Sequence, residues 1–158
     1  MQWSEVIADT TLADLPYKIE MNEWGKIEMS PATNFHSGLQ MEIAVLLREL
    51  LKDGKSYAEI SIETAKNVKV ADVVWASNQF LSQYGLETPY HVAPEICVEV
   101  MSPSNTEREM LMKTELYLER GAQEVWICLA TGQLRFFTSA GQQTHSPLCP
   151  DFPTVIQP

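Results

Sequence analysis

The chain has 158 residues, of which 45% are hydrophobic and 20% are charged, and this balance predicts one folded domain with a hydrophobic core. Its formal net charge of -10 argues against a strong, non-specific nucleic-acid binder, because such proteins usually carry a basic stripe. An acidic chain can still act on phosphates, since a bound metal ion inverts the local charge.

The N-terminal third is predicted to contain a helix, a hairpin and a second helix. Residues 4–16, SEVIADTTLADLP, predict a short helix that ends before Pro16. Residues 17–31 predict two short strands around a turn at 22–25. From Asn34 onward, apolar residues recur at spacings of three and four, which predicts an amphipathic helix that stops at KDGK. Its apolar residues are Leu39, Ile43, Leu46, Leu47 and Leu50.

The rest of the chain mixes strands with short helices. The patterns first predict strands at 56–64 and 68–77, joined at Lys66 and Asn67, and then one or two helical turns at 77–85 and a loop at 86–94. A strand within 94–105 follows, and after it a helix capped by Ser104 or Asn105 and ended by Gly121. The chain closes with a hairpin at 123–139, turning at Thr131 and Gly132, and a Pro-rich tail. This order predicts an α/β or α+β protein with a mixed sheet.

The cysteines and the apolar stretches indicate the compartment. Cys97, Cys128 and Cys149 are odd in number, and the first two lie inside predicted strands, so buried thiols in a reducing cytoplasm are expected rather than a disulfide. The opening MQWSEVIADT has no basic run before an apolar stretch, which predicts no secretory signal. The longest apolar stretches are too short to cross a bilayer.

Two carboxylates occupy strand positions whose neighbours on the same face are mainly apolar. In VKVADVVWAS, alternation puts Asp72 on the same face as three valines. In PEICVEVMSPSN, Glu99 shares a face with Cys97 and Met101. An unpaired buried charge is costly, so each acid is expected to have a partner or a chemical task.

A lysine on the following helix is placed in the same unusual way. At about 100° per residue, Lys113 falls between Leu116 and Tyr117. Lysines often extend past apolar neighbours to water, and a structural salt bridge with Asp72 or Glu99 is a second ordinary explanation. The three charges also form a coherent chemical set, because two carboxylates suit Mg²⁺ or Mn²⁺ while a lysine can orient the attacking water.

Long segments of the chain resemble a known family. VKVADVV and APEICVEVMSPSNTEREMLMKTELYLERGAQEVWI resemble the Uma-type restriction-endonuclease family, within the PD-(D/E)XK nuclease superfamily. YKIEMNEWGKIEMSPATNFH is similar to the family's N-terminal part, so the resemblance runs from about Tyr17 to Phe137. It implies a restriction-endonuclease-like α/β fold with a mixed central sheet flanked by helices. The single domain would comprise a helix and hairpin (1–33), a nuclease core (34–139) and a tail (140–158).

The resemblance also implies roles for individual residues. Asp72 matches the aspartate of the first half-motif and Glu99 the acid of the second, so both are implied ligands of Mg²⁺ or Mn²⁺, with the carbonyl of Val100 as a third. The family's usual lysine, two residues after the acid, is Met101 here. Lys113 is similar to the lysine that has migrated to the next helix in this family, and it is the implied water-positioning residue.

Further positions match the family less specifically. Glu20 and His36 match frequent family positions, and Glu20 and Glu42 are weaker candidates for an additional acid at the site. One departure is Ala71, which replaces the proline before the aspartate and is expected to have a mild effect, because that proline shapes the backbone and binds nothing.

The sequence therefore predicts a Mg²⁺- or Mn²⁺-dependent endonuclease that cleaves phosphodiester bonds in DNA. Only 11 lysines and arginines serve the whole surface, so a monomer would hold DNA poorly. A homodimer could compensate by lining a groove with Lys66, Lys69 and Arg108. The alternative is a catalytically inactive module that keeps the nuclease fold for binding or assembly.

Overall fold

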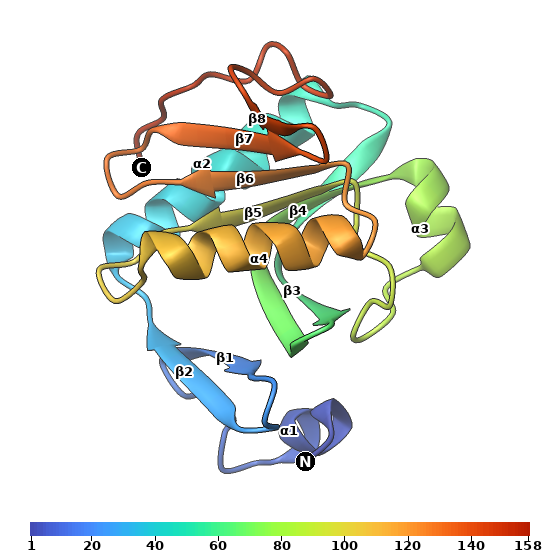
Figure 1. Cartoon of the computed structure of the whole chain (residues 1–158), viewed down its shortest axis with the longest axis vertical. Helices are drawn as coiled ribbons and strands as arrows, with labels where there is room; N and C mark the ends of the chain where they lie inside the picture. Colours follow the sequence, from blue (N-terminus) through green and yellow to red (C-terminus); the bar gives the residue numbers. More distant parts are fainter.

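The computed structural model describes the whole chain, residues 1–158, as two sheets with four helices around them (Figure 1). The helices are α1 (Trp3–Ala8), α2 (Asn34–Leu50), α3 (Asn78–Tyr84) and α4 (Glu107–Glu119), and the strands are β1 (Tyr17–Met21), β2 (Ile27–Pro31), β3 (Gly54–Thr64), β4 (Asn67–Ser77), β5 (Ile96–Val100), β6 (Glu124–Cys128), β7 (Leu134–Thr138) and β8 (Gly141–Gln143). None of these helices combines the length and the hydrophobicity that a crossing of a lipid bilayer requires.

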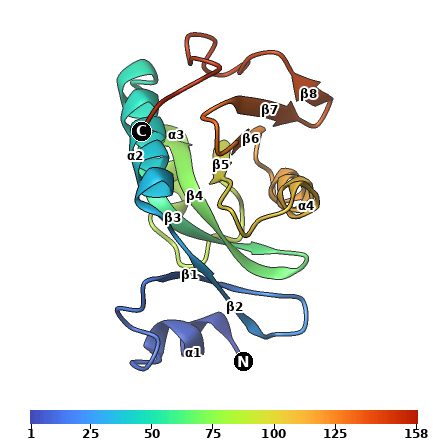
Figure 2. The ribbon, with the colours of Figure 1, turned by 90° about the vertical axis from the view of Figure 1, so that its left-hand side faces the viewer.

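The larger sheet is mixed and has six strands in the order β3-β4-β5-β6-β7-β8. β5 and β6 are parallel, and α4 forms the crossover between them, whereas every other neighbouring pair is antiparallel. Figure 2 shows the sheet edge-on, with α2 on one face and α4 on the other. The predicted architecture, a mixed central sheet flanked by helices, is confirmed.

The two helices bury different faces of the sheet. Leu39, Ile43 and Leu47 of α2, spaced four residues apart, are fully buried in one cluster with Val98 of β5. Burial of each such side chain is worth roughly 1.5–3 kcal/mol, which fixes α2 on this face. Tyr117 of α4 belongs to a second cluster on the other face.

The cap of α4 differs from the prediction. The N-cap is Thr106, not Ser104 or Asn105, and its side chain accepts a hydrogen bond from the backbone N–H of Glu109. The Glu109 carboxylate accepts one in return from the N–H of Thr106, which completes a capping box. Asn105 instead accepts hydrogen bonds from Ser102, closing the turn that precedes the helix.

The first helix is shorter than the sequence predicted. α1 ends at Ala8, well before Pro16. The carboxylate of Asp9 accepts hydrogen bonds from both the backbone N–H and the hydroxyl of Thr11. This local turn competes with further helical hydrogen bonding, so the chain leaves the helix there.

The C-terminal segment, predicted as a Pro-rich tail, contributes to the core. Phe152 and Ile156 are buried in the same cluster as α2. The backbone of Ile156 donates to the carbonyl of Gly132, at the predicted hairpin turn between β6 and β7. A Cβ atom at Gly132 would lie 2.0 Å from the carbonyl oxygen of Ile156, so this close approach requires glycine.

The N-terminal hairpin forms its own sheet from β1 and β2, below the large one in Figures 1 and 2. It docks through a small apolar cluster in which Met21 packs with Val68 and Val70 of β4 and with Trp3 of α1. This contact places β1 across the first half of β4, and two charged side chains of β1 thereby reach the central sheet.

Candidate active site

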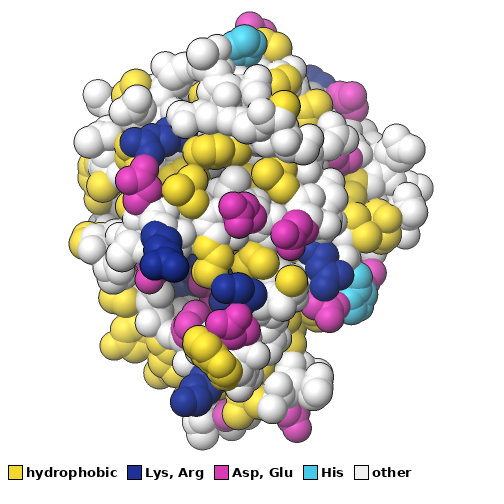
Figure 3. Space-filling view, in the orientation of Figure 1, with side chains coloured by type: hydrophobic (Ala, Val, Ile, Leu, Met, Phe, Trp, Pro, Cys, Tyr) yellow, Lys and Arg dark blue, Asp and Glu magenta, His cyan; other side chains and the backbone are white.

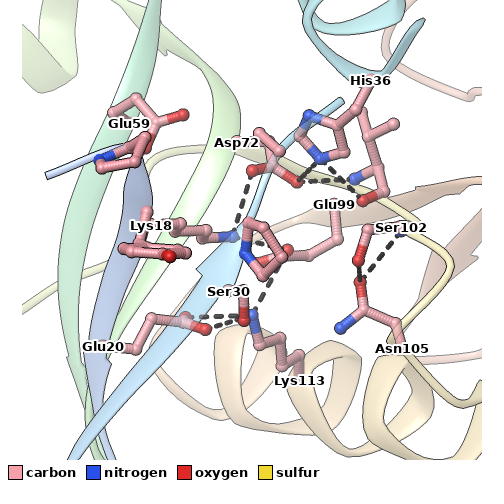
Figure 4. Close-up of a pocket in the computed structure, with 15 residues that line it drawn as sticks. Lys18, Glu20, Ser30, His36, Glu59, Asp72, Glu99, Ser102, Asn105 and Lys113 are labelled. Carbon is pink, nitrogen blue, oxygen red and sulfur yellow. Dashed lines mark hydrogen bonds and ion pairs between the residues drawn. The ribbon is translucent and has the colours of Figure 1, made fainter. Parts of the chain in front are cut away.

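A polar pocket of about 220 Å³ lies where β1, β4, β5, the start of α2 and α4 come together (Figure 4). The acidic and basic side chains that line it are Lys18, Glu20, His36, Glu59, Asp72, Glu99 and Lys113. The structure thus brings together Asp72, Glu99 and Lys113, the three charges that the sequence singled out.

The two acids lie where β4 and β5 separate. These strands pair only from Val73 to Trp75 on β4, and continuing their register by one residue sets Asp72 opposite Glu99. Oδ2 of Asp72 accepts a hydrogen bond of 2.7 Å from the backbone N–H of Val100, so a side chain satisfies that N–H where the sheet pairing has ended. Both acids are 1% exposed, and their charges therefore require partners inside the protein.

Lys18 of β1 bridges the two acids. Its Nζ lies 3.0 Å from Oδ1 of Asp72 and 3.0 Å from Oε2 of Glu99. The side chain is 12% exposed, so the ammonium group is largely withdrawn from water. The carboxylate oxygens of Asp72 and Glu99 consequently converge on one cation position, which this lysine fills.

Lys113 of α4 pairs mainly with Glu20. Its Nζ lies 2.8 and 2.9 Å from the two carboxylate oxygens of Glu20 and 3.4 Å from Oε2 of Glu99. Glu20 also accepts a hydrogen bond from the backbone N–H of Val70, which ties β1 to β4. A salt bridge between Lys113 and Asp72, one of the ordinary explanations considered from the sequence, is not formed, because Lys18 takes that place.

Two further side chains orient the acids. Tyr117 of α4 donates a 2.7 Å hydrogen bond to Oε1 of Glu99. Nε2 of His36, in the first turn of α2, lies 3.0 Å from the carbonyl oxygen of Val100 and 3.4 Å from Oδ2 of Asp72. Every carboxylate oxygen of Asp72 and Glu99 therefore has a partner, and both side chains are held in one orientation.

The network drives the pKa values of the two acids in opposite directions. Burial would raise the pKa of Asp72, but the Lys18 ammonium and the hydrogen bond with His36 outweigh it and hold this pKa below its usual value. Burial raises the pKa of Glu99, and the ammonium groups of Lys113 and Lys18 offset only part of that effect. Asp72 is thus the more firmly ionised acid, and Glu99 depends more strongly on cations close by.

The same charges act on the basic groups and on Glu20. Burial lowers the pKa of Lys18, yet Glu99 and Asp72 outweigh it and raise this pKa well above its ordinary value. The hydrogen bond with Asp72 raises the pKa of His36. For Glu20 the desolvation due to burial is outweighed by Lys113 and Lys18, so its pKa is lowered. The contacts consequently form a compensated cluster of three carboxylates, two ammonium groups and one imidazole, and Glu59 is the fourth acid of the pocket wall.

Some predicted residues lie at the site and others do not. Glu20 and His36, both uncertain from the sequence, line the pocket. Glu42 is half-buried farther along α2 and is not among the residues that line it. Sequence reasoning missed Lys18 and the hydrogen bond of Tyr117. A signal for Lys18 was present, because it alternates with Glu20 along β1 and therefore shares its face.

Lys69, proposed to line a groove between two copies, cannot serve there. It is 3% exposed, and its ammonium group donates to the carbonyl of Met21 and lies 3.6 Å from Glu28. This lysine is held inside the junction between β4 and the N-terminal hairpin. Arg108 is exposed and Lys66 is partly exposed, next to Glu23.

The donor set fits a hard divalent cation under one condition. Nowhere do three His, Cys, Asp or Glu side chains gather in an arrangement that could by itself hold a metal ion. Mg²⁺ commonly takes one or two carboxylates and keeps several waters, so the converging oxygens of Asp72 and Glu99 suit it. Because Lys18 fills the position between them, its amine has to move away before another cation can bind.

The mixed sheet, with two acids at the separation of β4 and β5 and with lysines beside them, agrees with the restriction-endonuclease-like fold that the resemblance implied. Residues 12–157 match the family Uma2, described as "Putative restriction endonuclease", and the chain belongs to this family. The resemblance noticed in the sequence is thereby confirmed. No curated protein matches the chain.

A solved structure from Anabaena variabilis has the same fold. Described as a "putative nuclease belonging to DUF820", it is 16% identical to this chain, with a TM-score of 0.72. The match covers 90% of this chain and 83% of the other. Family membership and fold together support a nuclease.

Proposed function

We propose that this protein is a metal-dependent endonuclease that hydrolyses phosphodiester bonds in DNA. Asp72 and Glu99 would hold Mg²⁺ or Mn²⁺, and the carbonyl of Val100 would be a third ligand once His36 releases it. When bound, such an ion lowers the pKa of a coordinated water and neutralises charge on the phosphoryl group.

The position of the Lys113 amine suits it to orient the attacking water. It lies 3.4 Å from Glu99, and its bidentate contact with Glu20 holds the side chain in place. A fixed ammonium group at this position would also offset negative charge in the transition state. Glu20 would act as a positioning residue, through Lys113, and not on the substrate.

One observation carries the proposal: the carboxylate oxygens of Asp72 and Glu99 converge on a single cation position at the wall of a pocket. Structural acids do not need such an arrangement, because an acid at a sheet can be satisfied by neutral donors alone. Two adjacent buried carboxylates that share a cation are, in contrast, suited to binding a divalent ion.

The test combines cleavage with metal-linked stability. Supercoiled plasmid and linear DNA are incubated with the protein and with Mg²⁺ or Mn²⁺. Asp72→Ala is expected to lower the cleavage rate about a thousandfold or more. Millimolar Mn²⁺ is expected to raise the Tm of the wild type and to have no such effect on Asp72→Ala.

Glu115→Ala is the matched control, because Glu115 is an exposed acid on α4 outside the pocket. It should cleave DNA as the wild type does. Asp72→Asn keeps the shape of the side chain and shows whether a loss of cleavage follows from loss of charge or from unfolding. Divalent-dependent cleavage by Asp72→Asn at the wild-type rate would remove Asp72 from the metal site.

A second candidate function is a nuclease-fold module without catalysis, which serves binding or assembly. The contact of Lys18 with both acids favours it, because the lysine already neutralises them without any added ion. The two candidates differ in their response to metal. Absence of any shift in Tm at millimolar Mg²⁺ and Mn²⁺ would favour the inactive module.

The expected homodimer remains part of the proposal, now without Lys69 in the groove. On the face seen in Figure 3, Lys and Arg side chains lie singly beside acidic ones and form no continuous stripe. A second copy would double the few basic groups available to a DNA backbone. Sedimentation at several protein concentrations, with and without DNA, measures this directly.

A further inference from the structure

The turn between β1 and β2 presents the most exposed large apolar side chain of the protein. Trp24 is 75% exposed, whereas the other three tryptophans, Trp3, Trp75 and Trp126, are at most 9% exposed. Isolated apolar residues on a surface are common, but tryptophan has the largest apolar area to keep in contact with water. The indole of Trp24 is therefore available to contact a ligand near the candidate active site.

The turn that carries Trp24 is held by its own hydrogen bonds. Oδ1 of Asn22 accepts from the backbone N–H of Trp24 at 3.1 Å and from that of Lys26 at 3.0 Å. The backbone N–H of Asn22 also donates to the carbonyl of Lys26, and Gly25 takes the positive φ of +70° that the turn needs. The backbone under the indole is thus fixed before any ligand arrives, which lowers the entropy lost on binding.

Trp24 lines a second pocket, of about 490 Å³, that adjoins the candidate active site. The two pockets share five lining residues: Glu20, Ser30, Pro31, Asn105 and Lys113. The apolar part of the second wall consists of Trp24, Met29, Met110 and Met112. The two pockets therefore lie next to each other, and the ion pair between Glu20 and Lys113 is part of the wall of both.

The charges of the second wall are largely neutralised among themselves. Its carboxylates pair with lysines of the same wall: Glu20 with Lys113, Glu23 with Lys66, and Glu28 with Lys69. The remaining acid, Glu109, accepts the N–H of Thr106 in the cap of α4. Such a wall offers little to a phosphate group, but the indole of Trp24 and the accessible parts of Met29 and Met112 suit a flat, uncharged ring.

From these contacts we propose that the pocket beside Trp24 binds an unpaired nucleobase of the nucleic-acid substrate. The inference rests on the proposed nuclease function and specifies its substrate: a single strand, or a duplex that is locally unpaired next to the cleaved bond. Bases in an intact duplex are stacked on each other and offer no free face to an indole. A stacked base would add binding free energy that does not come from positive charge, which suits an acidic chain with few basic groups.

Binding of labelled DNA tests the proposal directly. The anisotropy of a fluorescein-labelled single strand of about 12 nucleotides is measured in EDTA, which prevents cleavage, and is compared with that of the same sequence as a duplex. The wild type is expected to bind the single strand more tightly. Trp24→Ala should weaken single-strand binding about tenfold, and Trp24→Phe, which keeps an aromatic ring, should weaken it less.

Intrinsic fluorescence gives a second readout. Because Trp24 is the exposed tryptophan and the others are buried, the single strand should quench wild-type emission and leave Trp24→Phe nearly unchanged. Met41→Ala is the control, since Met41 is 65% exposed on α2 and lines neither pocket. Its single-strand affinity should equal that of the wild type.

Three results would overturn the proposal: unchanged single-strand affinity of Trp24→Ala, tighter binding of the duplex than of the single strand, or a dimer in sedimentation that Trp24→Ala dissociates. The last result would make the pocket an interface between protein chains. Unchanged single-strand affinity of Trp24→Ala, in a protein that cleaves DNA, would remove the base pocket while leaving the nuclease function intact. Loss of single-strand affinity in Trp24→Ala, in a protein that cleaves nothing, would remove the nuclease function while leaving the pocket.

Discussion

The protein buries carboxylates in two very different ways. Glu124 of β6 is 1% exposed, and its oxygens accept hydrogen bonds from the indole N–H of Trp126, the hydroxyl of Ser146 and the backbone N–H of Leu148. All three donors are neutral, and two belong to the C-terminal segment that Glu124 ties to the sheet. Glu124 therefore has a structural role, because it holds the C-terminal segment against the sheet.

Asp72 and Glu99 are equally buried, but their shared partner is a cation on a long side chain, and they border a pocket. A neutral N–H donor fixed in the backbone cannot be exchanged for a metal ion without breaking the fold. A lysine ammonium can be exchanged, because the rest of its side chain can turn aside. Burial alone therefore does not distinguish a functional acid from a structural one, and Asp72 and Glu99 differ from Glu124 in sharing a charged partner at the wall of a pocket.

The largest effect on stability is expected at Glu124. Glu124→Ala leaves three buried donors without an acceptor and should lower the free energy of unfolding by about 3 kcal/mol or more. For a chain of this size this corresponds to a fall in Tm of roughly 6–12 °C. Urea unfolding followed by circular dichroism measures the change.

Glu124→Gln is the matched variant, because it keeps one acceptor oxygen and the shape of the side chain. It should lose less stability than Glu124→Ala. DNA cleavage by the folded fraction of either variant should equal that of the wild type. A change in the metal dependence of cleavage would show that Glu124 is coupled to Asp72 and Glu99. It would contradict the distinction between a structural acid and the acids of the candidate site.

A smaller effect is expected from Lys18→Met. Removal of the ammonium group leaves Asp72 and Glu99 close together without their shared cation, so stability without divalent ions should fall. The freed position should bind Mn²⁺ about tenfold more tightly, which corresponds to about 1.4 kcal/mol. Isothermal calorimetry with Mn²⁺, together with the Mn²⁺-dependent rise in Tm, reports this without any need for cleavage.

Lys26→Met is the control for Lys18→Met, because Lys26 is an exposed lysine on the same hairpin. Its response to Mn²⁺ should match that of the wild type. If Lys18→Met binds Mn²⁺ no more tightly than Lys26→Met, then Lys18 does not compete with the metal, and the pair of acids would be as structural as Glu124.

The smallest effect on stability is expected at an ion pair on the protein surface. Glu107 lies near Arg135 with a separation of 2.6 Å, but the glutamate side chain is 65% exposed. Glu107→Gln should change the free energy of unfolding by about 0.5 kcal/mol or less, because water screens such pairs. A loss comparable to that of Glu124→Ala would show that proximity, and not burial, governs charge pairs in this protein.

Helices and strands with a regular spacing of apolar residues could be predicted from the sequence. Period-two valines predicted β4, and the spacing of Leu39, Ile43 and Leu47 predicted α2. The C-terminal segment has no such period, so the burial of Phe152 and Ile156 could not be predicted from it. The position of Ile156 is set by a hydrogen bond from its backbone N–H to the carbonyl of Gly132, which is distant in the sequence.

The residues of the candidate site likewise fall into those that the sequence could predict and those that it could not. Asp72, Glu99 and Lys113 could be singled out because each interrupts an apolar face of a regular element. Lys18 and Glu20 alternate with apolar residues along β1, but nothing in this local pattern shows which part of the protein the hairpin packs against. The role of Lys18 emerges only when Met21 and Val70 bring β1 next to β4.

The docking of that hairpin has a consequence for the charge balance of the pocket. The central sheet contributes only negative groups to the pocket, and the strand β1 delivers one of the two ammonium groups that neutralise them. Without β1, the ammonium group left near these acids would be that of Lys113, 3.4 Å from Glu99. The contact of the hairpin with β4 therefore both buries apolar surface and supplies the cation that Asp72 and Glu99 share.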